Sequence, residues 1–284
     1  MKPDASDWTL VTVTYNNADE LREWWAGEDL HGARWLVVDN DSSDGTAEYA
    51  EALGAEVIRM NTNAGFSRAN NVGLQKTASR YVAFVNPDVR IDASTLPLLG
   101  RLATERDAIV CPQLCNPDGS TQPNGRGLPF LVDKLAHRGI RLPSSSLDSY
   151  IPNTSHRLTF VAWAMGAAIC GESARIRSSG GWDERYFLYY EDHAFGLDAW
   201  SRGQEVIVVP EARWTHAWKR ETKGLSLKPW LREIASASRF YSQHPGLLLP
   251  RNSQGRLRWR GAAHRFGDPV PQKCDDGLKP IDGS

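Results

Sequence analysis

The sequence predicts an α/β fold with a mainly parallel central sheet flanked by helices. Apolar strand patterns alternate with helical patterns through the first hundred of its 284 residues, as in the β-α units that build parallel sheets. Polar residues directly follow several of these strands, at the carboxyl ends where such sheets bind ligands. Tyr15, Asp39 and Asp88 occupy three of these positions.

Four strands and four helices are expected in this region. The strands lie at 8–14, 34–40, 56–60 and 81–85, and the helical patterns at 18–26, 46–53, 66–78 and 93–104. The strand segments are short and largely apolar, which is typical of buried strands. The last of them, YVAFV, stops at Asn86, Pro87 and Asp88. A carboxylate is therefore left just beyond a strand end.

The second half of the chain is less regular. Residues 111–156 are rich in Pro, Gly, Ser and Asn around a short helical candidate at 130–138, and part of this long excursion is expected to be mobile. Further expected elements are an apolar run at 159–170, a short helix from Glu172, a helix from about Glu191, a strand at 205–210 and a helix at 227–243. We expect one domain over residues 1–245 and a basic, polar tail over 246–284.

The bulk composition excludes several classes of protein. With 33 basic and 34 acidic residues the net charge is -1, so there is no general attraction for nucleic acid, and no nucleic-acid partner is expected. The start, MKPDASDWTLVTVTY, lacks the basic and long apolar stretches of a secretory signal, and the longest apolar run is shorter than the ~20 residues of a spanning helix. A cytoplasmic location is expected. The four cysteines, at 111, 115, 170 and 274, are expected to be buried free thiols.

Two common nucleotide-binding sites are excluded. A Rossmann dinucleotide site needs a glycine-rich turn after the first strand, but Tyr15, Asn16 and Asn17 stand there and no glycine precedes Gly27. A P-loop needs the dipeptide Gly-Lys, which is absent from the sequence. A diphosphate bound without a glycine cradle is most simply neutralised by a divalent cation on carboxylates, for which Asp88 is well placed.

Eight segments make the sequence recognisable as a set. In chain order they are VTVTYNNADELREWW, LVVDNDSSDGTAEYA, NTNAGFSRANNVGL, YVAFVNPDVRI, NPDGSTQPNGR, WAMGAAICG, GGWDERYFLYYEDHAFGLDAWSRG and VPEARWTHAW. Over about residues 8–220 this set resembles family 2 glycosyltransferases of the rhamnosyltransferase-like group. The resemblance implies a GT-A fold, a nucleotide-diphospho-sugar donor, a divalent metal (Mn or Mg), and inverting transfer to a hydroxyl of a glycan or lipid-linked glycan. The leading donor is dTDP-rhamnose. Within the expected domain, the donor-binding half lies at about 1–110 and the acceptor-side half at about 111–245.

The resemblance also assigns roles to individual residues. The residues expected to bind the nucleotide sugar are Thr14, Tyr15, Asp39, Asn63, Gly65, Phe66, Asn70 and Asn86. Those expected on the acceptor side are Trp163, Gly166, Trp182, Asp183 and Glu191. Asp88 and His216 are expected to hold the metal, and Asp192 to be the base that takes the acceptor's proton. Because Asn86 stands where an Asp-x-Asp pair has its first carboxylate, it is expected to hydrogen-bond the donor while Asp88 holds the cation.

Each carboxylate or histidine has a structural alternative. Asp39 and Asp44 lie in DNDSSDG, which forms a turn and helix cap in many proteins, and Asp192 can cap the helix that it starts. His216 can be a packed, hydrogen-bonded residue among tryptophans. His193 is a weaker candidate for a substrate contact.

The aromatic residues near these positions also have two interpretations. The side chains of Trp163, Trp182, Tyr189 and Tyr190 either stack on sugars or fill the core.

The sequence departs from the family pattern in three places. Ala194 and Ala162 stand where relatives often have acidic residues, so the acceptor is expected to differ from the usual one. AWKRETKG follows His216 in place of a glycine- and serine-rich loop, which weakens the assignment of His216 to the metal.

The tail and the rival functions leave further alternatives open. The tail segment RNSQGRLRWRGAAHRF, with five arginines, either contacts a membrane surface that carries lipid-diphosphate acceptors or is a solvated charged helix. The rival functions are a sugar-nucleotide pyrophosphorylase-like transferase and a catalytically silent sugar- or nucleotide-binding module.

Overall fold

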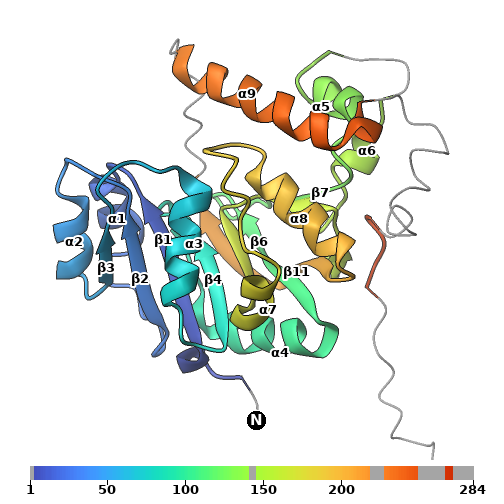
Figure 1. The fold of residues 1–284 in the computed structure, drawn as a ribbon. Helices are drawn as coiled ribbons and strands as arrows, with labels where there is room; N and C mark the ends of the chain where they lie inside the picture. Colours follow the sequence, from blue (N-terminus) through green and yellow to red (C-terminus); the bar gives the residue numbers. More distant parts are fainter. Residues whose placement is uncertain (1–2, 141–144, 218–226, 249–265, 271–284) are drawn as a thin grey trace, which may run out of the picture.

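The protein is built on one large sheet (Figure 1). The computed structural model describes residues 3–140, 145–217, 227–248 and 266–270. The strands are β1 (Trp8–Thr14), β2 (Arg34–Asp39), β3 (Glu56–Arg59), β4 (Tyr81–Val85), β5 (Val89–Arg90), β6 (Ala108–Cys115), β7 (Gly125–Arg126), β8 (Thr159–Phe160), β9 (Trp163–Ala164), β10 (Ala168–Glu172) and β11 (Glu205–His216). The α-helices are α1 (Ala18–Trp24), α2 (Thr46–Ala52), α3 (Phe66–Lys76), α4 (Leu96–Arg106), α5 (Leu131–His137), α6 (Leu147–Tyr150), α7 (Ser173–Ser178), α8 (Glu191–Ser201) and α9 (Leu227–Gln243).

The strand order of the sheet is β3-β2-β1-β4-β10-β6-β11-β5, with β8 paired to β11. The first four strands are parallel, β10 is antiparallel to β4 and β6, and β11 is parallel to β6. The carboxyl ends of β1, β2 and β4 therefore meet at one edge, which carries the polar residues singled out in the sequence. The predicted α/β fold class is confirmed, with a nearly continuous apolar lining on both faces of its parallel half.

Two apolar layers sandwich the sheet. On one face the strands pack against α1, α2 and α4, and on the other against α3, α7 and α8. Alternate residues of β1 divide between the layers: Leu10 belongs to the first, and Val11 and Val13 to the second. A third cluster joins α5, α6, α8 and α9, with Trp163, Tyr190 and Phe240 in it. In Figure 1, α9 accordingly lies beside α5 and α6.

The structure corrects three expectations for the second half. Residues 108–115 form the central strand β6, although the sequence there was expected to begin an irregular excursion. The apolar run at 159–170 is divided among β8, β9 and β10, because these pieces pair with different strands. The strand expected at 205–210 continues to His216 through a register shift between Val209 and Arg213, where Pro210 supplies no backbone donor.

Several smaller points follow from the described residues. Cys111, Cys115 and Cys170 are buried free thiols as expected, whereas Cys274 lies outside the described residues. Residues 249–265 and 271–284 of the tail, and residues 218–226 after His216, also lie outside them. None of the helices described is both long and apolar enough to cross a membrane. The domain boundaries stay a prediction.

Candidate active site

Thr14 and Asp39 end two neighbouring parallel strands and lie in register. The Thr14 hydroxyl donates to Oδ1 of Asp39 at 3.0 Å, and the backbone N–H of Ser42 donates to Oδ2 at 3.0 Å. Asp39 is 3% exposed, so the two hydrogen bonds hold an ionisable group in a fixed orientation at the strand edge. Tyr15 directly follows and is 51% exposed, free to stack on a flat ligand.

Asp44, from the same DNDSSDG segment, is a structural cap. Its carboxylate accepts the backbone N–H groups of Thr46 at 3.0 Å and Ala18 at 3.1 Å, which start α2 and α1. Burial raises the pKa of Asp44, but the Thr46 hydroxyl and these N–H groups outweigh it and hold the pKa below its ordinary value. The cap interpretation therefore applies to Asp44, while Asp39 is positioned by different partners.

The segment from Asn63 to Phe66 lies against this edge. Oδ1 of Asn63 accepts from the Asn40 amide at 2.9 Å and from the Gly65 N–H at 3.1 Å, so the segment is joined to the residue after Asp39. Gly65 has φ +89, and a Cβ there would lie 2.6 Å from the carbonyl oxygen of Phe187. The Phe66 N–H donates to that same oxygen at 2.8 Å. Only glycine allows this close approach between the Asn63–Phe66 segment and the loop before α8.

Asn70 lies one turn into α3 and is almost fully buried. Its amide donates to the carbonyl of Phe66 at 3.1 Å. Its expected contact with the donor stays a prediction.

The turn after β4 brings Asn86 and Asp88 to the same edge. The Asn86 N–H donates to the carbonyl of Ala167 at 2.9 Å, and the carbonyl of Asp88 accepts the Ala217 N–H at 3.0 Å. Val89 of β5 pairs with His216 of β11, which places His216 beside this turn. Nε2 of His216 is 3.5 Å from Oδ2 of Asp88. The two residues expected to hold a metal are thus brought together, although they are more than a hundred positions apart.

Gln122 fixes the tautomer of His216. The Gln122 amide nitrogen donates to the carbonyl of His216 and to Oδ1 of Asn116, both at 2.8 Å, which leaves its oxygen 2.8 Å from Nδ1 of His216. Nδ1 must therefore carry the ring proton, and Nε2 presents a lone pair to Asp88. Burial lowers the pKa of His216, with Asp88 opposing, so the imidazole is neutral at neutral pH.

A neutral Nε2 and a carboxylate that face each other can both coordinate a cation placed between them. Asp88 and His216 therefore fit as two protein ligands of a divalent metal. Within the described residues, no group of three or more His, Cys, Asp or Glu side chains is clustered for metal binding. Further ligands would have to come from the bound diphosphate or water, as is usual for Mg²⁺ at phosphates.

Gly166 lies between the turn that carries Asn86 and Asp88 and the residue Asp192. It precedes Ala167, which accepts from Asn86, and its own N–H lies 3.4 Å from Oδ2 of Asp192. A Cβ at Gly166 would lie 3.6 Å from Cβ of Asp192 and 3.5 Å from the ring of Phe66. The expected donor residue Phe66, the expected acceptor residue Gly166 and the expected base therefore converge.

Asp192 lies in the first turn of α8, after two strained residues. Tyr189 and Tyr190 have φ of 69 and 68, a left-handed conformation that non-glycine residues rarely adopt and that costs ~1 kcal/mol or more each. Oδ1 of Asp192 accepts the His193 backbone N–H at 2.8 Å and lies 2.6 Å from Nδ1 of His193. Burial raises the pKa of Asp192, but His193 and Lys134 outweigh it and keep the pKa below its ordinary value. An ionised carboxylate is thus held with Oδ2 only weakly engaged.

Glu191 lies beside Asp192, and its pKa is shifted in the opposite direction. Burial and the charge of Asp192 raise its pKa well above the ordinary value, which favours the protonated form of this carboxyl. Its Oε2 is buried and has no hydrogen-bond partner in the described part of the chain, like Nε1 of Trp163 and of Trp182. Buried polar atoms of this kind are rare unless a ligand or water meets them.

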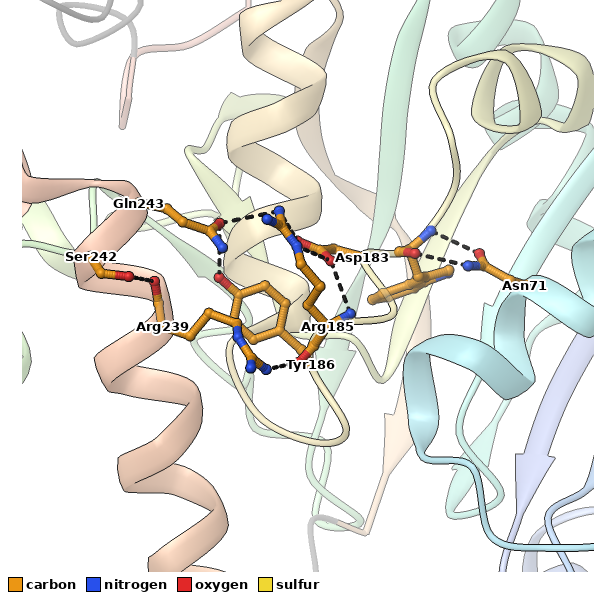
Figure 2. Close-up of polar contacts among 8 residues, drawn as sticks. Asn71, Asp183, Arg185, Tyr186, Arg239, Ser242 and Gln243 are labelled. Atoms are coloured by element: carbon orange, nitrogen blue, oxygen red, sulfur yellow. Dashed lines mark hydrogen bonds and ion pairs between the residues drawn. The ribbon is translucent and has the colours of Figure 1, made fainter.

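Two further residues that are expected on the acceptor side have structural roles. Trp182 is buried and packs edge-on against Phe66 and Phe84, both at 5.3 Å between ring centroids. Asp183 binds Arg185, which also reaches Gln243 of α9 (Figure 2). Asn71 of α3 holds the backbone of Trp182: its side-chain oxygen accepts the Trp182 N–H and its amide donates to the Trp182 carbonyl, both at 2.8 Å. Sugar contacts of Trp182 and Asp183 stay predictions.

The sequence patterns assign no role to two residues at this site. Gln122 lies in the recognised segment NPDGSTQPNGR, which was the available signal. Lys134, on α5, places Nζ 2.9 Å from Nε2 of His193. No sequence pattern points to Lys134, because its contact with His193 joins residues that are 59 positions apart.

Known proteins resemble this chain in sequence. A family model described as glycosyl transferase family 2 matches residues 9–173. An N-acetylglucosaminyl-diphospho-decaprenol L-rhamnosyltransferase of Mycobacterium tuberculosis is 26% identical over 236 residues, 73% of this chain and 75% of the relative. The low-salt glycan biosynthesis hexosyltransferase Agl10 of Haloferax volcanii is 24% identical over 195 residues, 66% of this chain and 60% of the relative.

Solved structures resemble it in fold. The mannosyltransferase PcManGT from Pyrobaculum calidifontis, in complex with GDP-Man and Mn²⁺, superposes with a TM-score of 0.57 at 16% identity, over 92% of this chain and 71% of that one. GalNAc-T7 with UDP, GalNAc and Mn²⁺ gives 0.57 at 15% identity, over 91% of this chain and 55% of that one. At such identities the likeness establishes the fold alone, which is the GT-A fold.

Proposed function

The chain belongs to glycosyltransferase family 2, and from this premise we propose that it transfers rhamnose, with inversion, from dTDP-rhamnose to a hydroxyl of a lipid-linked glycan. That it is a glycosyltransferase that uses a nucleotide-sugar donor follows from the family. The choice of sugar is supported by the relative named as an L-rhamnosyltransferase, and the choice of acceptor by the diphospho-decaprenol in that name. Membership of this family favours glycosyl transfer over a pyrophosphorylase-like reaction.

The observation that carries the proposal is the arrangement of Asp192. An inverting transfer needs a base on the side of the acceptor hydroxyl, opposite the leaving diphosphate. Asp192 is ionised, Oδ1 is bound by His193, and within the described ranges the hydrogen bonding of Oδ2 is limited to a 3.4 Å contact with the Gly166 N–H. In the proposed step Oδ2 accepts the hydroxyl proton while the acceptor oxygen bonds to the anomeric carbon. The bond to the diphosphate breaks with its electron pair on the diphosphate.

On the donor side, the bound diphosphate and nucleotide would meet the strand edge described above. Thr14, Tyr15 and Asp39 would contact the nucleotide, and Asn86 the ribose or sugar. The segment from Asn63 to Asn70, including Gly65 and Phe66, would line the donor. The support for this is the convergence of Phe66, Gly166 and Asp192.

Asp88 and His216 would hold the divalent metal, Mn or Mg. When bound, such a metal stabilises the negative charge that grows on the leaving diphosphate. The fit of the donor set rests on the tautomer that Gln122 imposes and on the 3.5 Å separation of the two side chains.

Trp163, Trp182, Asp183 and Glu191 would face the acceptor. A lipid-linked acceptor would place the enzyme at the cytoplasmic face of a membrane. The expected contact through the basic tail concerns residues outside those described.

A donor panel tests the proposal. Wild-type protein with Mn²⁺ or Mg²⁺ is incubated with dTDP-rhamnose, UDP-, GDP- and other dTDP-sugars and a synthetic prenyl-diphosphate glycan, while nucleotide release is followed. Release is expected with dTDP-rhamnose above all other donors, and NMR of the product is expected to show the anomeric configuration opposite to that of the donor. Turnover of another sugar overturns the donor assignment, retention of configuration overturns the base role of Asp192, and turnover undiminished by EDTA overturns the metal.

A further inference from the structure

Three side chains from two helices form one chain of polar contacts at the candidate base. Nζ of Lys134 on α5 lies 2.9 Å from Nε2 of His193, and Nδ1 of His193 lies 2.6 Å from Oδ1 of Asp192 on α8. His193 is 6% exposed. Lys134 is partly exposed as a residue, but its ammonium end points inward, over the ring of Tyr190 at 3.7 Å from the centroid.

Aromatic packing leaves His193 little freedom to turn. Its ring is stacked between Trp163, at 3.5 Å between centroids, and Tyr190, at 4.7 Å, with Phe240 edge-on at 5.7 Å. The two nitrogens therefore keep their assigned neighbours, Lys134 on one side and Asp192 on the other. This is a positioned imidazole and not a side chain presented to a substrate, which was the weaker expectation from the sequence.

The number of protons available decides which atom donates and which accepts in each contact of His193. A charged lysine has only donors, so Nε2 of His193 must be the acceptor and the single ring proton must be on Nδ1. Nδ1–H then donates to Oδ1 of Asp192. If Nε2 were protonated as well, it would face the ammonium of Lys134 with no acceptor to meet it. Lys134 and His193 can therefore hold only one added proton between them, and the cation–π contact of Nζ with the ring of Tyr190 favours placing it on Lys134.

The electrostatics agree with this geometry. Burial, with the charge of Lys134, lowers the pKa of His193 to about 4, although Asp192 opposes the shift. Burial also lowers the pKa of Lys134 to about 7, although Asp192 opposes it. The lysine is thus charged in the pH range where an ordinary histidine beside a carboxylate would take up a proton.

We propose that Lys134 is a positioning residue for the base: by occupying Nε2 of His193 it keeps that imidazole neutral, with Nδ1–H clamped to Oδ1 of Asp192 and Oδ2 left for the acceptor hydroxyl. A protonated His193 would instead form an ion pair with Asp192 and reduce its basicity. The inference rests on the proposed role of Asp192 as base.

Other charges face this group from every element packed around it. Besides Asp192 and Glu191 on α8, they are Arg138 on α5, Glu233 and Tyr241 on α9, Arg126 on β7, Tyr150 on α6 and Tyr190 in the loop before α8. Arg138 pairs with Glu233, so these two charges largely cancel at Lys134. Arg126 adds to the positive side and disfavours protonation of His193 further.

The first test reads His193 directly and needs no turnover. In ¹⁵N-histidine NMR of the wild type, His193, identified among the seven histidines by its loss in His193→Asn, is expected to be the neutral Nδ1–H form from pH 8 to pH 5. In Lys134→Met its titration midpoint is expected to rise by at least ~1 pH unit. A wild-type His193 that is protonated at pH 6, or that carries its proton on Nε2, overturns the proposal even if no variant folds.

The second test measures the pH dependence of kcat, which reports the protonation of the proposed base. The acid limb of the kcat profile is expected at least ~1 pH unit higher in Lys134→Met than in wild type, with an unchanged KM for the donor. Lys134→Arg, which retains a cationic donor, is expected to restore the wild-type limb. An unchanged limb in Lys134→Met overturns the proposal, because a merely structural role would lower kcat at all pH values alike. If no nucleotide sugar is turned over, the proposed function fails, while the NMR measurement still decides the role of Lys134.

Discussion

Replacing Gln122 by leucine tests the proposed metal site through a residue that would not touch the metal. The Gln122 oxygen is the acceptor that keeps the ring proton of His216 on Nδ1, at 2.8 Å, and both residues are buried. Without it the imidazole can move its proton to Nε2 and donate to Asp88, 3.5 Å away, which occupies both proposed ligands. Loss of such a supporting hydrogen bond costs about 10- to 100-fold in metal affinity, or about 1.4–2.8 kcal/mol.

The assay is calorimetric titration of Mn²⁺ into protein saturated with dTDP, with UDP and GDP as alternative nucleotides. Asn116→Ala is the matched control, because Asn116 contacts the same Gln122 amide and not His216. Its metal affinity is expected to stay within about threefold of wild type. If Gln122→Leu folds and binds Mn²⁺ as tightly as wild type, the tautomer argument is wrong and His216 is not a ligand through Nε2.

Three further predictions follow from the structure. Gly65→Ala is expected to lower the free energy of unfolding by about 3 kcal/mol, because residue 65 has a φ of +89 and the new Cβ would lie 2.6 Å from the carbonyl oxygen of Phe187. The control Gly54→Ala has a φ of +91 but open space around the new Cβ, and is expected to lose about 1 kcal/mol. Equal losses in urea unfolding would refute the contact with Phe187. Metal binding without nucleotide is expected to be weak, since Asn86 supplies no charge beside Asp88, and tight binding of Mn²⁺ to the free protein would contradict this. Glu191→Gln is expected to stabilise the protein, and the gain is expected to grow as pH rises above about 4.5. Burial and Asp192 raise the pKa of Glu191 in the folded state, so above the unfolded pKa the wild-type unfolded state loses this proton more readily than the folded state, and the free energy of unfolding falls. Urea unfolding at pH 5, 6 and 7 measures the gain, and a gain that shrinks with pH reverses the sign of the argument.

The sheet and its edge could be predicted because their signals are local. β1, β2 and β4 are largely apolar runs that end in a polar residue or are directly followed by one, and parallel pairing alone brings Thr14, Asp39 and Asp88 to one edge. β6 was missed because the composition of residues 111–156, rich in Pro and Gly, concealed a strand whose burial comes from its neighbours β10 and β11.

The surroundings of the base could not be predicted, because they depend on contacts between distant elements. Lys134 meets His193 across 59 positions, and Gln122 meets His216 across 94. Nothing in the sequence indicates that Trp182 packs between Phe66 and Phe84. A tryptophan in a glycine-rich turn is equally compatible with a core position and with a binding surface. Such assignments follow from packing and not from periodicity.

The most direct test of the central claim compares Asp192→Asn with Asp198→Asn, an exposed carboxylate on the same helix. With the donor that wild type turns over and its metal, Asp192→Asn is expected to lose about 10²- to 10⁴-fold in kcat while binding the donor as tightly as wild type, because asparagine cannot accept the hydroxyl proton. Asp198→Asn is expected to retain wild-type kcat. An Asp192→Asn variant that retains wild-type turnover would contradict the assignment of the base.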